Sequence, residues 1–226
     1  EKKNNRWGQP EVAGFSGNYS DDSPFFSADG NKLYFESKRP LSESSGASDW
    51  SIWYVEKSNG RWSEAKYDSV FSSMKIMTPS IASNGNLYFC SSEREGEGSS
   101  DIFISGYING AYAEPQNLGE NVNSKFMEAW IHISPDESYL LFTSVGRPEG
   151  TGLFISAKNP DGSWSEAKFI TEINKNGDER FVTVSPDGKY LFFNRQYDRF
   201  GESSVDRLTK MDLDIRLTSP QNGKGD

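Results

Sequence analysis

Short apolar runs alternate with polar turns along the whole chain, at an interval of about fifty residues. Each turn is followed by an aromatic-rich run, such as Leu33 to Phe35, and preceded by another apolar run, such as Phe181 to Val184. Three of the four turns end in glycine, which accepts the positive φ of tight turns, and the remaining one is Ser-Pro-Asp-Glu. Each pair of runs therefore predicts a β-hairpin. The four turns occupy residues 27–30, 82–85, 134–137 and 185–188.

Two further elements recur in the same frame. A third apolar run follows three of the hairpins, at residues 51–55, 101–105 and 152–156. An aromatic element then follows an Asn- or Asp-containing turn, at Trp62, Tyr112 and Trp164, and the chain opens with another copy at Trp7. Four short strands in about fifty residues are the size and strand number of one β-propeller blade.

The phase of the repeat predicts how the fold closes. Trp7 has no hairpin before it, whereas the fourth hairpin lacks a fourth strand after it. We therefore expect an all-β, four-bladed propeller of four-stranded antiparallel blades, closed by the N-terminal strand. The expected single domain covers residues 1–219, with blades at about 20–70, 75–120, 127–172 and 179–218 plus 6–12, and residues 220–226 form a disordered tail. A fragment of a larger ring is the alternative.

The fourth repeat departs from the pattern. Val205 to Met211 carries charges where the third strand should alternate between apolar and polar residues. Two interpretations remain open for this blade. Either Asp212 to Leu217 takes the place of the third strand, or this edge of the blade is irregular.

Composition agrees with an all-β protein. Hydrophobic residues make up 34% of the 226 residues, but the aromatic share reaches 14%, which is too high for a disordered polar chain. The 21 Gly and 10 Pro residues fit short strands joined by many turns. No run approaches the eighteen apolar residues that a transmembrane helix needs.

The charge and the metal-binding residue types exclude several functions. With 24 basic and 33 acidic residues the net charge is −9, which argues against nucleic-acid binding. A single Cys rules out an internal disulfide, and one Cys with one His disfavours a structural zinc site. We expect neither a metal nor a cofactor.

The repeated signature resembles the TolB-like, or WD-like, β-propeller repeats. The resemblance rests on residues 185–193, a Ser-Pro-Asp-Gly turn with its strand, and on the strand Asp101 to Ser105. It covers residues 6 to 196. It implies a propeller fold and a bacterial protein exported to the periplasm or the cell exterior, with a lipid anchor as a further option in the full gene product. Propellers host many activities, so the resemblance leaves the chemistry open.

Charged side chains recur where the ends of the blade strands should meet at the channel mouth. Six residues before each turn stand Asp21, Glu128 and Glu179, with Ile76 in the second blade. Arginines follow the second strands and could bind an anionic or sugar-acid ligand by two hydrogen bonds each, or could pair with neighbouring carboxylates within the fold. These are Arg39, Arg94, Arg147 and either Arg195 or Arg199.

Departures from the repeat supply further candidates. Lys75 replaces an acidic residue in the second blade, and Trp130 lies on the innermost strand of the third. His132, the only histidine, lies on the same strand and is expected to share a face with Glu128, which could orient it. His132, Glu128 and Glu179 are the candidate catalytic residues. Arg39, Arg94, Arg147, Arg195, Asp21, Lys75 and Trp130 are the candidate ligand-binding residues.

Two classes of function stay open. The chain lacks a Gly-x-Ser-x-Gly elbow, a phosphate-binding glycine loop and a His-Glu-x-x-His helix. We therefore favour a noncatalytic, monomeric propeller that binds a protein or glycan at its channel mouth. The alternative is a lyase or hydrolase of an acidic polysaccharide that uses His132, Glu128, Arg147 and Glu179 at the same mouth.

Overall fold

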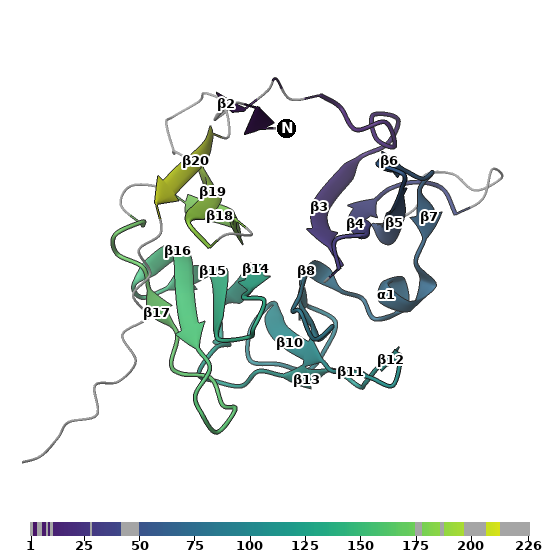
Figure 1. The fold of residues 1–226 in the computed structure, drawn as a ribbon. Coiled ribbons are helices and arrows are strands. Elements are labelled where there is room, and N and C mark those ends of the chain that lie inside the picture. The colour runs from purple at the N-terminus through teal and green to yellow at the C-terminus, as the bar shows by residue number, and fades with distance from the viewer. Residues whose placement is uncertain are drawn as a thin grey trace, which may run out of the picture. The chain divides into compact units, whose positions relative to one another are not determined.

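The four repeats form four antiparallel sheets (Figure 1). The structure is a computed structural model that describes residues 2–3, 6–7, 9, 11–27, 29–41, 50–174, 178–185, 188–196 and 207–212. Contacts divide the chain into two units, Glu1–Lys75 with the first sheet and Ile76–Asp226 with the other three. The expected single domain stays a prediction.

The first unit contains one full sheet and a short N-terminal hairpin. The sheet is formed by β3 (Asp21–Phe26), β4 (Lys32–Ser37), β5 (Ser51–Ser58), β6 (Arg61–Trp62) and β7 (Lys66–Tyr67). The five-residue helix α1 (Ser69–Ser73) follows β7, and Asp68 caps it by accepting a hydrogen bond from the Phe71 amide. The hairpin pairs β1 (Lys2–Lys3) with β2 (Arg6–Trp7).

The second unit contains three sheets. The second sheet comprises β8 (Met77–Ile81), β9 (Leu87–Ser91), β10 (Asp101–Ser105) and β13 (Gln116–Asn117), with the hairpin β11 (Tyr107–Ile108) and β12 (Ala111–Tyr112) beside it. The third comprises β14 (Met127–Ile133), β15 (Tyr139–Arg147), β16 (Gly150–Ala157) and β17 (Lys168–Phe169). The fourth comprises β18 (Asp178–Val184), β19 (Tyr190–Gln196) and β20 (Arg207–Asp212).

The sequence predicts that the aromatic elements form the fourth strands of their sheets, and this prediction was wrong. Arg61–Trp62 folds back on the end of β5 as a hairpin arm, and Trp164 bridges to Lys158 in the same way. The fourth strand instead begins four residues after each aromatic residue, at Lys66, Gln116 and Lys168. These two-residue strands are too short and too polar to show alternation in the sequence.

The third strand of the fourth sheet is β20, which pairs with β19 from Tyr190↔Asp212 to Arg195↔Arg207. The interpretation that Asp212 to Leu217 forms this strand was therefore wrong, because the charged stretch itself takes the strand position. The interpretation of the N-terminal strand as the missing fourth strand stays a prediction. That strand pairing would join a segment of the first unit to the fourth sheet in the second unit, and the relative positions of the two units are not determined.

The core of the second unit lies between its sheets. One buried cluster joins the second and third sheets through Tyr88, Ile102, Phe142, Phe154 and Trp164. A second joins the third and fourth sheets and is formed by Leu141, Leu153, Ile173, Val182, Leu191 and Phe193. Successive residues of β15 thus serve opposite faces, as the pleat of a strand requires. No helix among the described residues is long and apolar enough to cross a bilayer.

A polar contact crosses the same boundary between the second and third sheets. The carboxylate of Glu137 accepts hydrogen bonds from Tyr88 Oη at 2.7 Å, Asn86 Nδ2 at 2.9 Å and Lys158 Nζ at 3.0 Å. Burial alone would raise the pKa of Glu137, but these donors outweigh it and lower the pKa below its usual value. Glu137 therefore remains ionised and links the turn of the third repeat to the second sheet.

Replacing Tyr88 by Phe should lower the free energy of unfolding by about 1.5–3 kcal/mol, the usual cost of losing a hydrogen bond to a charged group. The ring stays in place, so packing against Trp164, whose ring centroid lies 6.1 Å away, is retained. Urea unfolding of the variant and the parent protein measures the difference. A loss below about 0.5 kcal/mol would show that the carboxylate is satisfied without the tyrosine.

Candidate functional site

The first and third sheets each contain a buried cluster of one carboxylate, one serine and one arginine. In the first sheet, Asp21 Oδ1 accepts hydrogen bonds from Ser37 Oγ at 2.7 Å and Arg39 Nη1 at 2.8 Å. In the third, Glu128 Oε1 accepts them from Ser144 Oγ at 2.9 Å and Arg147 Nη2 at 3.0 Å. Each arginine also donates to a backbone carbonyl of the segment entering its sheet.

These clusters are buried and stacked on aromatic rings. Glu128 is fully buried and Arg39 is 7% exposed. The guanidinium of Arg39 lies 4.9 Å from the ring centre of Phe35, and that of Arg147 lies 4.7 Å from the ring centre of Phe154. Arg39 and Arg147 thus already bind carboxylates of their own sheets, so a ligand would have to replace an internal partner. This geometry favours a structural role for both arginines.

The second sheet lacks the carboxylate of this cluster. Ile76 holds its position and is buried, and Arg94 instead donates to Glu114 Oε1 at 3.2 Å, near the surface. The side chain of Arg94 is 27% exposed and that of Glu114 is 87% exposed. Lys75, next to Ile76, has a left-handed backbone with φ of 54°. The site role expected for Lys75 stays a prediction, and Arg94 is held by an exposed carboxylate.

In the fourth sheet, Glu179 is fully buried and pairs across the backbone with Arg195. By this register Arg195 takes the place of the cluster's serine, since Ser144 pairs with Glu128 in the third sheet. The side chain of Arg195 and residue Arg199 lie outside the described residues. The role expected for Arg195 therefore stays a prediction.

His132 and Glu128 do not share a face of β14, which corrects the expectation from their spacing. A bulge between Ala129 and His132 adds a residue, so Glu128 lies opposite Ser144 and His132 lies opposite Leu141. Ser144 and Leu141 are three residues apart on β15 and point to opposite sides. Glu128 thus joins the arginine cluster, and His132 turns toward the other face, beside Tyr139. The proposed acid–base pair is not formed.

Burial lowers the pKa of His132 to about 4. Its Nε2 atom is buried and has no hydrogen-bonding partner in the described part of the chain. A histidine of this kind is neutral at pH 7 and must take up a proton in the unfolded state as the pH falls below 6.5. Its contribution to stability is complete above pH 6.5 and decreases toward pH 4.

We expect His132→Leu to reduce the acid sensitivity of folding. Between pH 7.5 and pH 4 the parent protein should lose up to about 3 kcal/mol more stability than the variant, since a shift of one pKa unit corresponds to 1.36 kcal/mol. The carboxylates contribute equally to both proteins, so the difference isolates the histidine. Urea unfolding at the two pH values measures it, and parallel losses would contradict a neutral, buried His132.

Every sheet has a bulge on its first strand, and each bulge holds a non-glycine residue in the left-handed region. These are Ser23, Thr78, Trp130 and Phe181, with φ between 44° and 54°. The register of the pairing shifts at each of them. Left-handed backbone costs about 1–3 kcal/mol in a non-glycine residue and is a true outlier for a bulky one. The third and fourth sheets place large aromatic rings at these strained positions.

The bulges of consecutive sheets in the second unit contact one another. Thr78 Oγ1 accepts a hydrogen bond from the Trp130 amide at 3.1 Å. The rings of Trp130 and Phe181 lie 5.1 Å apart at an angle of 50°, and the guanidinium of Arg180 lies 4.9 Å from the Trp130 ring. Phe181 is 39% exposed. Sequence reasoning identified Trp130 but missed Phe181 and Arg180, because neither departs from an apolar or charged strand pattern.

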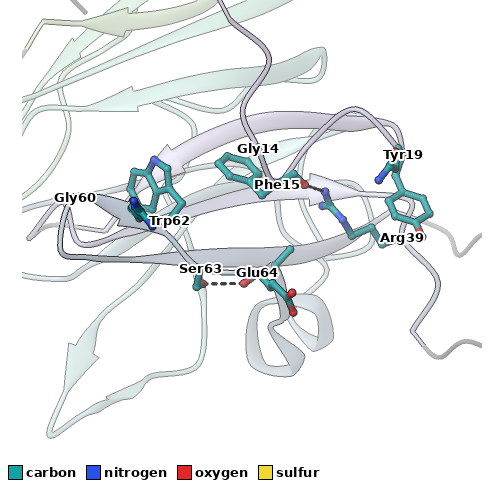
Figure 2. A pocket seen from close by; sticks show the side chains of 11 residues that line it. Gly14, Phe15, Tyr19, Arg39, Gly60, Trp62, Ser63 and Glu64 are labelled. Carbon is teal, nitrogen blue, oxygen red and sulfur yellow. Dashed lines mark hydrogen bonds between the residues drawn. The ribbon is translucent and has the colours of Figure 1, made fainter.

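A cavity of about 770 Å³ lies in the first unit, against the aromatic hairpin arm (Figure 2). Its lining includes Phe15 and Trp62, whose rings meet edge-on at 6.5 Å, and Arg39, which donates to the Phe15 carbonyl. The corresponding place in the second unit holds a cavity of about 470 Å³ beside Trp164. There Tyr88 and Ile104 of the preceding sheet form part of the wall.

The two cavities therefore mark the same position of the repeat. In the second unit, the hairpin tryptophan is 6% exposed because the preceding sheet covers it. In the first unit, Phe35, Trp53 and Val55 form a small cluster with Trp62 at its edge. The larger cavity thus lies where the second unit packs one sheet on the next. Its lining resembles a surface for sheet packing more than a pocket for a small molecule.

Comparisons with known proteins bear on the fold. No family model matches the chain. A plant protein, probable glutamyl endopeptidase, chloroplastic, from Arabidopsis thaliana, is 40% identical over 70 residues, which are 31% of this chain and 7% of that protein. Solved structures of TolB from Acinetobacter baumannii and of putative TolB from Agrobacterium tumefaciens resemble the chain with TM-scores of 0.52 and 0.55, at 16% and 18% identity.

The coverage of these TolB structures is uneven. They match 88% and 89% of this chain, but the chain spans 43% and 64% of their own lengths. At such low identity the likeness concerns the fold alone. With its sheets of antiparallel strands and, in the part of the chain that the structure describes, one short helix, the chain has a TolB-like β-propeller fold.

Proposed function

We propose that the four sheets close into a four-bladed ring and that this ring is a noncatalytic binding module. Two TolB structures of the same fold support the propeller, and the repeat supports the closure. In the complete sheets, the second residue of the fourth strand is Tyr67, Asn117 or Phe169, each five residues after the hairpin aromatic. The same step from Trp7 leads to Val12, which we therefore place as the second residue of the missing fourth strand in the fourth blade.

Exposed Val12 and the aromatic cluster of the first unit support the same closure. Val12 is 78% exposed. Phe35 and Trp53 correspond to Phe142 and Phe154, which the third sheet contributes to the second unit's core, and Tyr88 supplies part of the other half. By the pairing registers, Phe192 of the fourth sheet corresponds to Tyr88. We therefore propose that the fourth blade covers Trp62 as the second sheet covers Trp164.

The noncatalytic role is supported by the bonding of Glu128 within the fold and by the protonation state and orientation of His132. Glu128 is bound by Arg147, Ser144 and Ser124, with Ser124 Oγ donating to it at 2.6 Å. His132 is neutral and faces the other side of the strand. General acid–base catalysis needs two groups within reach of one substrate, and this pair does not meet that need. The ligand, a protein or a glycan, binds at the channel mouth of the ring.

The test incubates the purified chain with acidic oligosaccharides and follows reducing ends and unsaturated products. We expect no product above the level given by heat-denatured protein. Product formation that disappears in His132→Ala would overturn the noncatalytic role and favour a polysaccharide lyase or hydrolase. We further propose that the protein acts outside the cytoplasm, as the TolB-like fold suggests, and a full gene without an export signal would contradict this location.

A further inference from the structure

We propose that the edge of β13, together with the cavity beside it, binds an extended segment of a partner protein by strand addition. β13 lies at one edge of the second sheet and β8 lies at the other (Figure 1). In the proposed ring β8 lines the channel, so this surface is distinct from the channel mouth and the inference goes beyond the ligand proposed there. The segment that fits carries a basic side chain between two apolar side chains. We call this surface the β13 groove.

The edge of β13 lacks the charge that protects the corresponding edges of two other sheets. In the first and third sheets the fourth strand begins with a lysine, Lys66 or Lys168, whereas β13 begins with Gln116. An exposed lysine on an edge strand discourages the addition of a further strand. Both residues of β13 are exposed and neither carries a charge. Among the three complete sheets of the described chain, the second therefore has the edge most open to a partner.

The register of β13 determines which of its backbone groups face outward. The Leu118 amide donates to the Ile102 carbonyl of the neighbouring strand at 3.1 Å. Because hydrogen bonding alternates along an antiparallel strand, the amide and carbonyl of Asn117 point to the outer edge. The next outward-facing residue, Pro115, has no N–H and offers its carbonyl alone. The edge thus suits a short antiparallel strand that pairs mainly with Asn117.

The cavity of about 470 Å³ gives such a strand a place for apolar side chains. Its lining includes Ile104 and Leu118 of the second sheet, Trp164 of the third, and both residues of β13. Trp164 belongs to the buried cluster between these two sheets, and Ile104 and Leu118 pack against that cluster. Since side chains alternate along a strand, the two neighbours of the residue opposite Asn117 would project onto this face. Large apolar side chains there would extend the existing core.

The other face of β13 favours a basic side chain. Asn117 Nδ2 and the Glu97 amide both donate to the carboxylate of Asp101, each at 2.8 Å. Gly96 lies so close that a Cβ on it would be 3.2 Å from Asn117 Nδ2. The exposed residues Glu95 and Glu97 flank this glycine. The residue opposite Asn117 shares their face, so a positive charge on it is complementary to this loop.

A second copy of this chain fits the β13 groove less well. Two copies would bring together molecules that each carry a net charge of −9. A second β13 would also present Gln116 and Asn117, and neither is basic. We therefore infer that the partner is a different protein, and self-association is one outcome of the test.

The probe is a library of random heptapeptides displayed on phage and selected against the immobilised full chain. We expect enrichment of peptides with an apolar–basic–apolar triplet. An enriched peptide is then synthesised with a fluorescent label, and its Kd for the chain is measured by fluorescence polarisation. N-methylation of its basic residue removes the amide that would donate to the Asn117 carbonyl, and it should weaken binding at least about tenfold.

The chain supplies matched variants for the same measurement. Gln116→Lys copies the lysine of the corresponding edges and should weaken binding at least about tenfold. Lys168→Gln makes the reverse exchange in β17 and should leave the Kd unchanged. Glu95→Gln combined with Glu97→Gln should weaken binding of the peptide but not of a version in which norleucine replaces the basic residue. Thermal melting checks that each variant folds.

Several results would overturn the inference. These are a selection that enriches no such triplet, an enriched peptide that binds Gln116→Lys as it binds the parent, and an N-methylated peptide that binds as well as the unmodified one. Sedimentation of the parent protein alone completes the test, because a dimer that Gln116→Lys abolishes would assign the β13 groove to a second copy of this chain. None of these results bears on the channel mouth, so the proposed function is tested separately.

Discussion

Replacing Arg147 by Met should lower the free energy of unfolding by about 3–5 kcal/mol. The variant retains a long apolar stem beside Phe142 and Phe154 but removes the partner of Glu128. Glu128 is fully buried, and an unpaired carboxylate in such a place is far more costly than the pair is favourable. Two serine hydroxyls that donate to Glu128 remain and keep the loss within this range.

The matched control is Arg94→Met in the second sheet. Arg94 holds the corresponding position, but Ile76 replaces the buried carboxylate and the partner of Arg94, Glu114, is 87% exposed. Its loss should cost about 0–1 kcal/mol, as for other exposed ion pairs. The double variant Glu128→Ile with Arg147→Met should recover most of the stability, because it removes both charges. Equal losses for the two arginine variants in urea unfolding would contradict the buried pair.

Deleting residues 1–12 should lower the melting temperature by roughly 6–12 °C, whereas deleting residues 220–226 should change it by less than about 2 °C. The first deletion removes the strand that we propose completes the fourth blade, and it leaves an open sheet edge. It retains Phe15, which stacks on Phe35 at 5.4 Å, so the core of the first sheet is not altered directly. We expect the deletion to lower the free energy of unfolding by about 3 kcal/mol, because it removes the pairing and the burial of one strand.

Both truncations are measured by thermal melting of the purified proteins at one concentration. Equal melting temperatures would contradict closure by the N-terminal segment and favour a fragment of a larger ring. A milder variant, Val12→Lys, tests the same contact without removing backbone. It should destabilise the chain if Val12 becomes buried on closure, although Val12 is exposed within its own unit.

Much of the fold could be predicted because the repeat encodes it locally. Turns such as Ser185 to Gly188 and strands such as Leu87 to Phe89 carry their own signals of tight turning and alternation. The fourth strands could not be identified, because Lys66–Tyr67 and Gln116–Asn117 are exposed, polar and two residues long. Their position depends on pairing with the third strand, which no local pattern records.

The candidate site was harder to predict than the fold. The spacing of Glu128 and His132 suggested a shared face, but the bulge at Trp130 reverses the alternation. A bulge depends on φ and on the partner strand, so the sequence of one strand does not reveal it. The recurrence of acidic residues and arginines was visible, whereas their pairing within one sheet required the structure.

Closure of the four sheets is the central claim, and a cysteine cross-link tests its register. In the complete sheets, Trp53, Phe103 and Phe154 pair with the second residue of the fourth strand. Thr209 holds the same position in the fourth sheet, because it pairs with Phe193 as Phe154 pairs with Phe142. We therefore expect Val12 to lie opposite Thr209, with Glu11 opposite Lys210.

The measurement is disulfide formation in Val12→Cys with Thr209→Cys, in a background where the buried Cys90 is replaced by Ala. Directly paired residues in antiparallel strands have Cα atoms about 4.5–5.5 Å apart, within the range of a disulfide. Glu11→Cys with Thr209→Cys is the control, since adjacent residues point to opposite faces. We predict that mild oxidation gives an intramolecular cross-link in the first pair and little in the second. A cross-link between molecules, or none in either pair, would contradict the closed ring.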